Sequence, residues 1–167
     1  ALTFIMPDEA LDGSVYVIAR SGEEIDAGSY TLVKSAATSY SSSEVEAGDA
    51  LVITGTDLDL VKTVTFVGSS TPVEPSAKDE TSLTVRVPDD GKTGALTLTL
   101  LNGTTVTCPE LTFAQPSVTS MTGTRDKVDG KPVFKAGETV TLAGENLHLI
   151  KSIKLENAEV TTLTVSD

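Results

Sequence analysis

Hydrophobic and polar residues alternate along most of this chain, in short runs that end at Gly, Pro, Asn or Asp. A period of two is typical of β-strands that bury one face. Within residues 35–115 we predict strands at 36–40, 50–54, 61–67, 70–74, 82–87, 94–101 and 104–114, the last one broken near Pro109. About seven short strands at this spacing are typical of an antiparallel Greek-key sandwich of two sheets.

Residues 47–66 and residues 136–155 repeat one another without a gap. In each copy an Ala-Gly-acid turn leads into an alternating strand that ends at Gly55 or Gly144. A short polar loop then leads to a second alternating strand. Self-similarity at a fixed spacing indicates a repeated structural unit, so the chain is predicted to hold more than one sandwich.

A second match relates residues 1–34 to residues 82–115. In both copies a strand ends at Pro-Asp, because proline cannot donate to a ladder. We therefore predict a strand at 2–6, as at 83–87. Each copy continues into a hairpin, and Asn102-Gly103 is a strong turn signal because both residues accept a positive φ.

Together the two matches divide the chain into three parts. Residues 35–115 are predicted to be one complete domain, residues 1–34 the C-terminal half of a repeat, and residues 116–167 the N-terminal half of a repeat with eight extra residues in the loop 125–134. Three arrangements are open: a segment of a longer array, which we favour, a permuted domain formed by the two halves, or pairing of the halves between molecules. Isolated half-sandwiches would expose open edges and apolar faces.

Composition restricts the partners of this chain of 167 residues. It has 12 Lys and Arg against 24 Asp and Glu, a formal charge of -12, which repels phosphate backbones and anionic lipid headgroups. We therefore predict no nucleic acid partner. Cys108 is the sole cysteine, so no intrachain disulfide can form. The sequence holds no apolar span of about 20 residues and no signal sequence, so we predict no membrane insertion within it, and any export signal lies outside it.

The repeated segments resemble immunoglobulin-like domains of the IPT/TIG family. The resemblance is carried by Ala47-Gly48-Asp49, the strand 51–55, Asp57-Leu58 and Val64-Thr65-Phe66, and the strand 83–87 with Pro88 and Gly94 matches as well. It covers the complete unit and both partial units. It implies an all-β chain of tandem immunoglobulin-like (IPT/TIG, E-set) Greek-key β-sandwiches.

The acidic, Thr-rich tandem arrangement, free of Trp, most resembles multi-domain surface lipoproteins of gut Bacteroidetes that capture glycans. The resemblance implies a non-catalytic spacer in an exported protein of the bacterial cell surface, with polysaccharide or outer-membrane protein partners and no cofactor. One alternative is direct glycan or protein binding, through Tyr16 and Ile18 or through the loop 125–134. Another is an accessory domain of a polysaccharide-degrading enzyme. The oligomeric state is open.

Tyr16 is the candidate ligand contact with the best chemistry. Sugar-binding faces use exposed aromatic rings, and this chain has three Tyr, four Phe and no Trp. Alternation turns Tyr16 outward together with Ile18, where the matching strand carries Thr97 and Thr99. We favour packing against a neighbouring strand or unit over a ligand platform.

The other two tyrosines are predicted to be core or linker residues. Tyr30 matches Leu111 in the repeat, and Tyr40 matches Met121. The matching positions carry large apolar side chains, which a ligand contact would not require. Neither tyrosine is therefore a candidate for the ligand surface.

The polar residues do not indicate a specific metal-binding or catalytic site. His148 is the sole histidine, and a zinc site would need further histidine or cysteine ligands nearby, so a loop residue is predicted. Asp57, Asp59 and Asn146 supply oxygens that could bind calcium. The repeat favours instead a side chain at Asp57 and Asn146 that caps the turn after the preceding strand. Asp89-Asp90 is predicted to serve a turn, so no catalytic pair is assigned.

Overall fold

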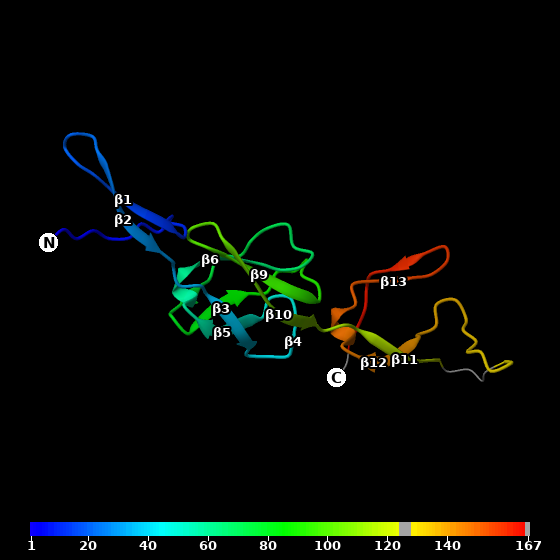
Figure 1. The fold of residues 1–167 in the computed structure, drawn as a ribbon. Coiled ribbons are helices and arrows are strands. Elements are labelled where there is room, and N and C mark those ends of the chain that lie inside the picture. Colours follow the sequence, from blue (N-terminus) through cyan, green and yellow to red (C-terminus); the bar gives the residue numbers. More distant parts are fainter. Residues whose placement is uncertain (124–127, 166–167) are drawn as a thin grey trace. The chain divides into compact units, whose positions relative to one another are not determined.

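The computed structural model describes residues 1–123 and 128–165. The chain forms two compact units, residues 1–113 and residues 114–167 (Figure 1). The all-β class predicted from the alternation is confirmed. Within the described residues, helical conformation is limited to the two 3-10 turns η1 (Leu58–Leu60) and η2 (Leu147–Leu149).

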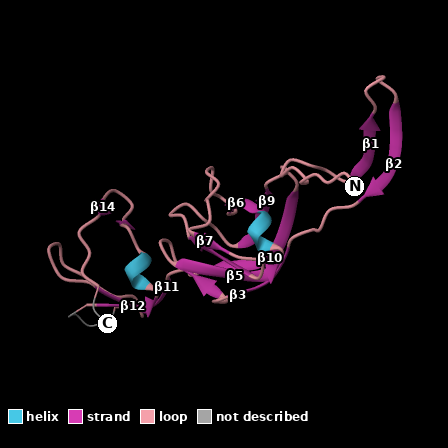
Figure 2. Cartoon of the chain, turned by 90° about the vertical axis from the view of Figure 1, so that its left-hand side faces the viewer, coloured by secondary structure: helices cyan, strands magenta, loops and turns pink. Residues whose placement is uncertain are grey.

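Residues 36–113 form two four-stranded sheets around one hydrophobic core, the arrangement of a β-sandwich (Figure 2). The first sheet has the order β3 (Ala36–Tyr40), β5 (Ala50–Thr56), β8 (Ser82–Arg86) and β7 (Ala77–Lys78). The second has the order β4 (Glu44–Val45), β10 (Thr105–Phe113), β9 (Gly94–Leu100) and β6 (Val61–Thr65). Neighbouring strands are antiparallel except β4 and β10, which are parallel.

Alternate residues of both sheets fill the core. Along β9 the buried side chains are Leu96, Leu98 and Leu100, and the threonines between them lie on the other face. Phe66 and Phe113 meet edge to face with their ring centroids 6.4 Å apart, an arrangement that adds to the energy of burial. The period-two pattern of the sequence thus separates core from surface.

The hairpin turns of unit 1 repeat one another in detail. The amide of Gly103 donates to the carbonyl of Leu100 at 3.0 Å, and the amide of Gly22 donates to the carbonyl of Ala19 at 2.9 Å. Both glycines have positive φ, 80° and 89°. Asn102 itself does not take a positive φ. In a three-residue loop only the last residue needs that conformation, and the Asn102 side chain instead accepts from the Thr104 amide.

The N-terminal part of unit 1 is a two-stranded hairpin, β1 (Gly13–Ile18) and β2 (Glu24–Tyr30). Its register matches that of β9 and β10 residue for residue, because Gly13 pairs with Tyr30 as Gly94 pairs with Leu111. The bulge also lies at the same place in both hairpins. The turn and bulge residues therefore produce the same strand pairing in both hairpins.

The predicted strand at 2–6 is wrong, since these residues take no strand conformation. Its match in the sandwich, β8, lies between β5 and β7 and bonds to both. No strand of the described part of unit 1 pairs with residues 2–6. An extended segment needs a partner for its backbone hydrogen bonds to become a strand. The sequence pattern of residues 2–6 alone therefore does not produce a strand.

Unit 2 contains β11 (Ser117–Thr122), β12 (Thr141–Glu145), β13 (Ile153–Lys154) and β14 (Glu159–Val160). β11 and β12 pair with the register and the bulge of β3 and β5. The match extends to side chains, because Thr38 Oγ1 donates to the Thr54 carbonyl and Thr119 Oγ1 to the Ala143 carbonyl, both at 3.0 Å. Unit 2 therefore repeats the β3–β5 strand pair, which lies at one edge of the first sheet of the sandwich.

Two predicted features of the sandwich differ from the structure. The strand predicted at 70–74 is reduced to an isolated bridge between Val64 and Val73, because Ser69, Ser70 and Thr71 form a turn closed by the Ser69 side chain. The short strands β4 and β7 are not predicted by the pattern. Each has two residues, too few to show a period.

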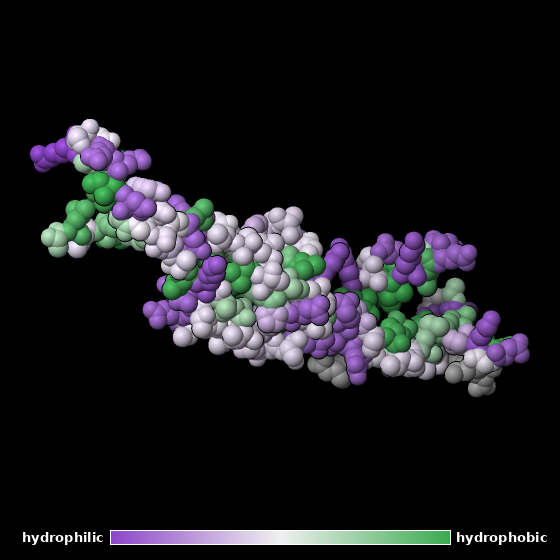
Figure 3. Space-filling model, in the orientation of Figure 1, coloured by the Kyte–Doolittle hydropathy of each residue, from purple (hydrophilic) through white to green (hydrophobic). Residues whose placement is uncertain are grey.

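The sandwich differs in burial from the parts of the chain that repeat its sequence, residues 1–34 and unit 2. Val85 of the sandwich is fully buried, whereas its match Phe4 is 66% exposed. Phe66 is 1% exposed, whereas its match Leu155 is 51% exposed. Figure 3 shows apolar side chains at the surface in the N-terminal part and in unit 2. These parts hold the strand pairs of a sandwich without its closed core.

Candidate functional site

Tyr16 and Ile18 lie on β1 and are 57% and 67% exposed. Their Cα partners on β2 are Asp26 and Glu24. An aromatic ring and an aliphatic side chain therefore stand beside two carboxylates on an exposed hairpin. Rings of this kind can stack on the CH faces of a sugar, and carboxylates accept hydrogen bonds from hydroxyls.

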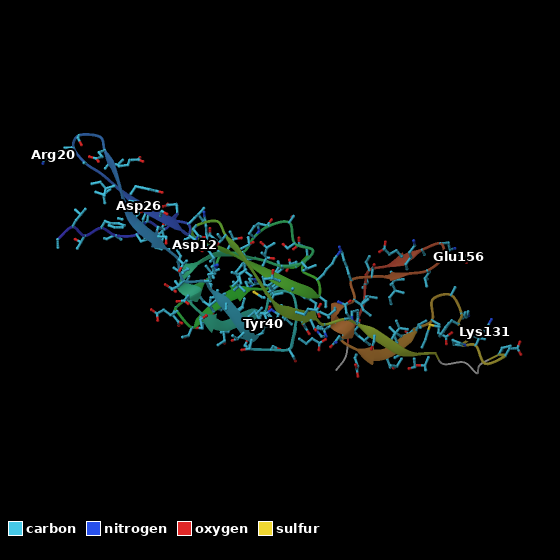
Figure 4. The ribbon with its side chains drawn as sticks, in the orientation of Figure 1. Asp12, Arg20, Asp26, Tyr40, Lys131 and Glu156 are labelled. Atoms are coloured by element: carbon cyan, nitrogen blue, oxygen red, sulfur yellow. The ribbon has the colours of Figure 1, made fainter. Side chains whose placement is uncertain are left out.

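The hairpin that carries Tyr16 is a two-stranded sheet of its own, β1 with β2. Asp26 is engaged locally, because its carboxylate accepts from the Gly28 amide at 2.8 Å. Figure 4 shows Asp26 on the hairpin and Arg20 at its tip. The exposure of Val17, on the other face of β1, shows that both faces of the hairpin are open. A ligand platform at Tyr16 stays a prediction.

Tyr40 packs against the core of the sandwich, in agreement with the prediction of a core or linker position. Its hydroxyl donates to the Pro109 carbonyl at 2.6 Å. Burial is the largest cause that raises the pKa of Tyr40 above its usual value, and the neighbouring Cys108 raises it further. Tyr30, at the end of β2, is half-buried.

Cys108 is buried beside Tyr40 on β10. Burial raises the pKa of its thiol from 9.0 to about 11, and a hydrogen bond with Tyr40 opposes part of that rise. The thiol is therefore protonated at neutral pH and is not a nucleophile. The contact joins strands of different sheets, and no spacing in the sequence indicates it.

A cavity of about 380 Å³ lies where the hairpin meets the sandwich. Its lining comes from the hairpin base and from the β9–β10 turn: Leu11, Asp12, Leu32, Val33, Lys34, Leu100, Asn102, Thr104, Thr105 and Val106. None of these lining residues was predicted from the sequence to belong to a site. The repeat offers one signal for the role of Asp12, because Asp12 matches Thr93. The hydroxyl oxygen of Thr93 accepts a hydrogen bond from the Phe113 amide at 2.9 Å.

The polar groups of this cavity hold the linker in place. The Asp12 carboxylate accepts from the Leu32 amide at 2.8 Å and lies 3.7 Å from Lys34 Nζ, with both side chains exposed. Asn102 Nδ2 donates to the Ala10 carbonyl at 3.2 Å. Their hydrogen-bonding capacity is thus largely directed at the chain itself, which makes this a joint between segments.

Asp57 and Asn146 share a left-handed backbone, with φ of 51° and 54°. The predicted side-chain caps are wrong, since neither side chain caps its 3-10 turn. Asp and Asn suit these positions because they tolerate positive φ better than other residues with a Cβ. Asn146 Nδ2 instead donates to the Gln115 carbonyl at 3.2 Å.

The remaining polar candidates are spread over the surface. His148 is exposed within η2, and Asp89 and Asp90 are exposed on a turn. Over residues 1–123 and 128–165, no three His, Cys, Asp or Glu side chains gather in a way that could hold a metal ion. Asp79 serves a turn as well: hydrogen bonds, first of all from the Thr81 amide, lower the pKa of its exposed carboxyl.

The predicted binding loop 125–134 is only partly described, because residues 125–127 lie outside the described residues. From Val128 onward it contains a two-residue bridge with Lys131 and a positive φ at Asp129. The loop stays a prediction as a ligand contact.

Among the described residues, no helix has both the length and the apolar character needed to span a bilayer. No protein-family model matches the sequence. The search of curated proteins also found no significant match.

Three solved structures are similar at low identity. They are a candidate phosphatase of Bacteroides thetaiotaomicron VPI-5482 (20% identity, TM-score 0.41), SGBP-B of the Bacteroides ovatus mixed-linkage glucan utilization locus in complex with mixed-linkage heptasaccharide (18%, 0.41), and the surface glycan-binding protein PbSGBP-B of Prevotella bryantii (19%, 0.39). The matches cover 50%, 72% and 68% of this chain but 19%, 34% and 27% of those chains. Similarity at this level does not by itself establish a shared function.

Proposed function

We propose that this chain is a non-catalytic spacer of tandem immunoglobulin-like, IPT/TIG-type units within an exported, surface-attached protein that captures polysaccharide. The carrying observation is that one backbone unit recurs with the same register while a hydrogen bond from Asn102 to Ala10 ties the N-terminal part to the sandwich. A spacer needs repeated units and joints of limited bending. The IPT/TIG resemblance of the repeated segments supports the same role.

The joint before the sandwich is held at three places. Asp12 fixes the Leu32 amide, Asn102 fixes the Ala10 carbonyl, and the buried Ser35 side chain donates to the Asp57 carbonyl at 2.6 Å. These contacts leave only residues 33 and 34 between the anchored positions. A linker this short restricts the angle between the hairpin and the sandwich.

The chain enters the sandwich at one end and leaves it at the other. Ser35 lies beside Asp57, and the Leu101 amide donates to the Leu60 carbonyl, so the chain enters at the end where β9 finishes. Phe113 bonds to Thr93, just before β9 begins, so the chain leaves at the opposite end. Seven residues of β9 span roughly 20 Å, which is the approximate distance between entry and exit of the sandwich.

The joint is tested by ¹⁵N relaxation. In the wild type, amides of residues 13–30 and of residues 36–113 are expected to report one rotational correlation time. Replacing both Asp12 and Asn102 with alanine should shorten the correlation time of the hairpin alone, and Asp26→Ala, a carboxylate on the same hairpin that bonds only locally, should not. Independent motion of the hairpin in the wild type would contradict the spacer proposal.

Direct glycan binding through Tyr16 and Ile18 is the alternative function, favoured by the exposure of both side chains. Calorimetric titration with oligosaccharides decides between the two. The spacer proposal expects no heat of binding at millimolar ligand. Binding that is lost in Tyr16→Ala and kept in Thr97→Ala, the matching position of the second hairpin, would establish the alternative.

A further inference from the structure

The turn between β9 and β10 contains an asparagine followed by a glycine, Asn102-Gly103. The other two asparagines of the sequence precede Leu147 and Ala158. A backbone nitrogen can attack the side-chain amide of the asparagine before it. A glycine nitrogen does so most readily, because no Cβ stands beside it and its backbone rotates freely. Asn102 therefore has the greatest chemical tendency of the three to deamidate.

The geometry of this turn does not require an asparagine. The matching turn of the first hairpin has Ser21 before Gly22. Gly22 and Gly103 close their turns with the same hydrogen bond, at 2.9 and 3.0 Å, and have φ of 89° and 80°. Asn102 differs in that its Nδ2 donates to the Ala10 carbonyl at 3.2 Å, outside the turn. Asn102 thus belongs to the joint as well as to the turn.

Hydrogen bonds engage both groups that would react in the folded turn. Asn102 Oδ1 accepts from the Thr104 amide at 3.1 Å and from Thr104 Oγ1 at 2.7 Å, while Nδ2 is bound to Ala10. The Gly103 amide donates to the Leu100 carbonyl at 3.0 Å. Reaction therefore requires local opening of these bonds. Gly103 is exposed, and a Cβ built on it would meet no atom within 4 Å, so neighbouring side chains do not obstruct the opening.

We propose that Asn102 is a site of spontaneous deamidation, controlled by opening of the joint between Asn102 and Ala10. In the open turn the Gly103 nitrogen loses its proton and bonds to Asn102 Cγ. The bond from Cγ to Nδ2 breaks, and ammonia leaves. Water then adds to either carbonyl of the cyclic imide, which yields aspartate or isoaspartate. The net reaction converts an amide and water into a carboxylic acid and ammonia, with no oxidation or reduction. The cavity of about 380 Å³ that Asn102 lines has room for water beside this group.

The product cannot restore the joint. A carboxylate has no hydrogen to donate, so the bond to the Ala10 carbonyl is lost. The new charge also lies among residues that include Asp12, and the cation of this lining, Lys34, is already 3.7 Å from the Asp12 carboxylate. An aspartate can still accept from the Thr104 amide, so the turn itself persists. Deamidation would therefore release the N-terminal part irreversibly, a consequence that rests on the proposed spacer function.

Peptide mapping of the whole chain by mass spectrometry, during incubation in warm, mildly alkaline buffer, provides the test. Asn102 should deamidate first, whereas Asn146 and Asn157 serve as internal controls. Thr104→Val removes the hydroxyl donor to Oδ1 and should raise the rate about fivefold, the effect of one hydrogen bond on the opening equilibrium. Thr104→Ser keeps the donor and should react at the wild-type rate. Equal rates at the three asparagines, or no acceleration in Thr104→Val, would overturn the proposal.

The release of the joint is measured separately by ¹⁵N relaxation. Asn102→Asp reproduces one product and should shorten the correlation time of residues 13–30 while residues 36–113 keep theirs. Asn157→Asp makes the same chemical change in unit 2 and should alter neither. Unchanged hairpin motion in Asn102→Asp would overturn the irreversible release. Independent hairpin motion in the wild type would contradict the spacer proposal instead, and the deamidation rates would still decide whether Asn102 is the modified residue.

Discussion

The sandwich of residues 36–113 and the repeated parts on either side of it have the same strand registers but opposite burial. Turns, bulges and glycines recur at matching positions, so neighbouring strands pair in the same way with or without a core. Over the residues that the structure describes, a buried core is present where front and back halves occur together, in the sandwich. Pairing is therefore encoded locally in this chain, whereas burial depends on which halves come together.

The sharpest test of this comparison changes matched apolar residues. Phe66→Ala should cost about 3–5 kcal/mol of unfolding free energy, because it leaves a cavity in the core and removes the ring contact with Phe113. Leu155→Ala should change it by less than about 0.5 kcal/mol, since Leu155 is exposed. Urea denaturation followed by circular dichroism measures both.

Matched glycines test whether strand pairing is local. A Cβ added at Gly55 would lie 1.9 Å from the Ala36 carbonyl oxygen, and one at Gly144 would lie 1.8 Å from that of Ser117. Gly55→Ala should destabilise the sandwich by about 1–3 kcal/mol, because backbone must move. Gly144→Ala should leave the urea midpoint of the sandwich unchanged while amide exchange in residues 117–122 accelerates. A change in that midpoint would contradict independent pairing.

Substitutions of Asp57, the residue with left-handed backbone after β5, should have a smaller effect on stability. Asp57→Val places a β-branched side chain at a φ of 51° and should cost about 1–2 kcal/mol. Asp57→Asn, which introduces the residue found at the matching position 146, should be close to neutral. Thermal unfolding compares the two variants, and a large loss in Asp57→Asn would show that the carboxylate itself matters.

The smallest effect concerns pH. Cys108 lies where the hairpin has Ala27, and burial raises the pKa of its thiol to about 11. The unfolded chain ionises this thiol at lower pH, so the stabilisation is present below pH 9 and is lost between about pH 9 and 11. Tyr40, whose pKa is also raised by burial, acts in the same direction at higher pH. Cys108→Ala should flatten the decline of the urea midpoint from pH 8 to 10, and an unchanged slope would contradict this assignment.

The sequence predicted most strands of the sandwich, because buried strands with several residues show a clear period. β3 agrees with its predicted range, and β5, β8 and β9 agree within two residues. The strand predicted at 2–6 did not form, since alternation states which face is apolar but not whether a partner strand is present. Local pattern and ladder formation are separate conditions.

The candidate site was less predictable than the fold. Exposure of Tyr16 and Ile18 followed from alternation. The hydrogen bond between Asn102 and Ala10 did not, because it joins residues 92 positions apart. The contact between Tyr40 and Cys108 likewise joins two sheets. Such contacts arise from packing of whole elements, which a period along the chain does not encode.

The parallel contact between β4 and β10 has a mechanical consequence. β4 follows β3, the strand by which the chain enters the sandwich, and β10 carries the exit; the pairs are Glu44 with Thr112 and Val45 with Phe113. Tension applied along a surface tether would load these bonds in shear, so they would have to rupture together instead of unzipping singly. Under hydrodynamic drag, this small patch would bear the first resistance to extension.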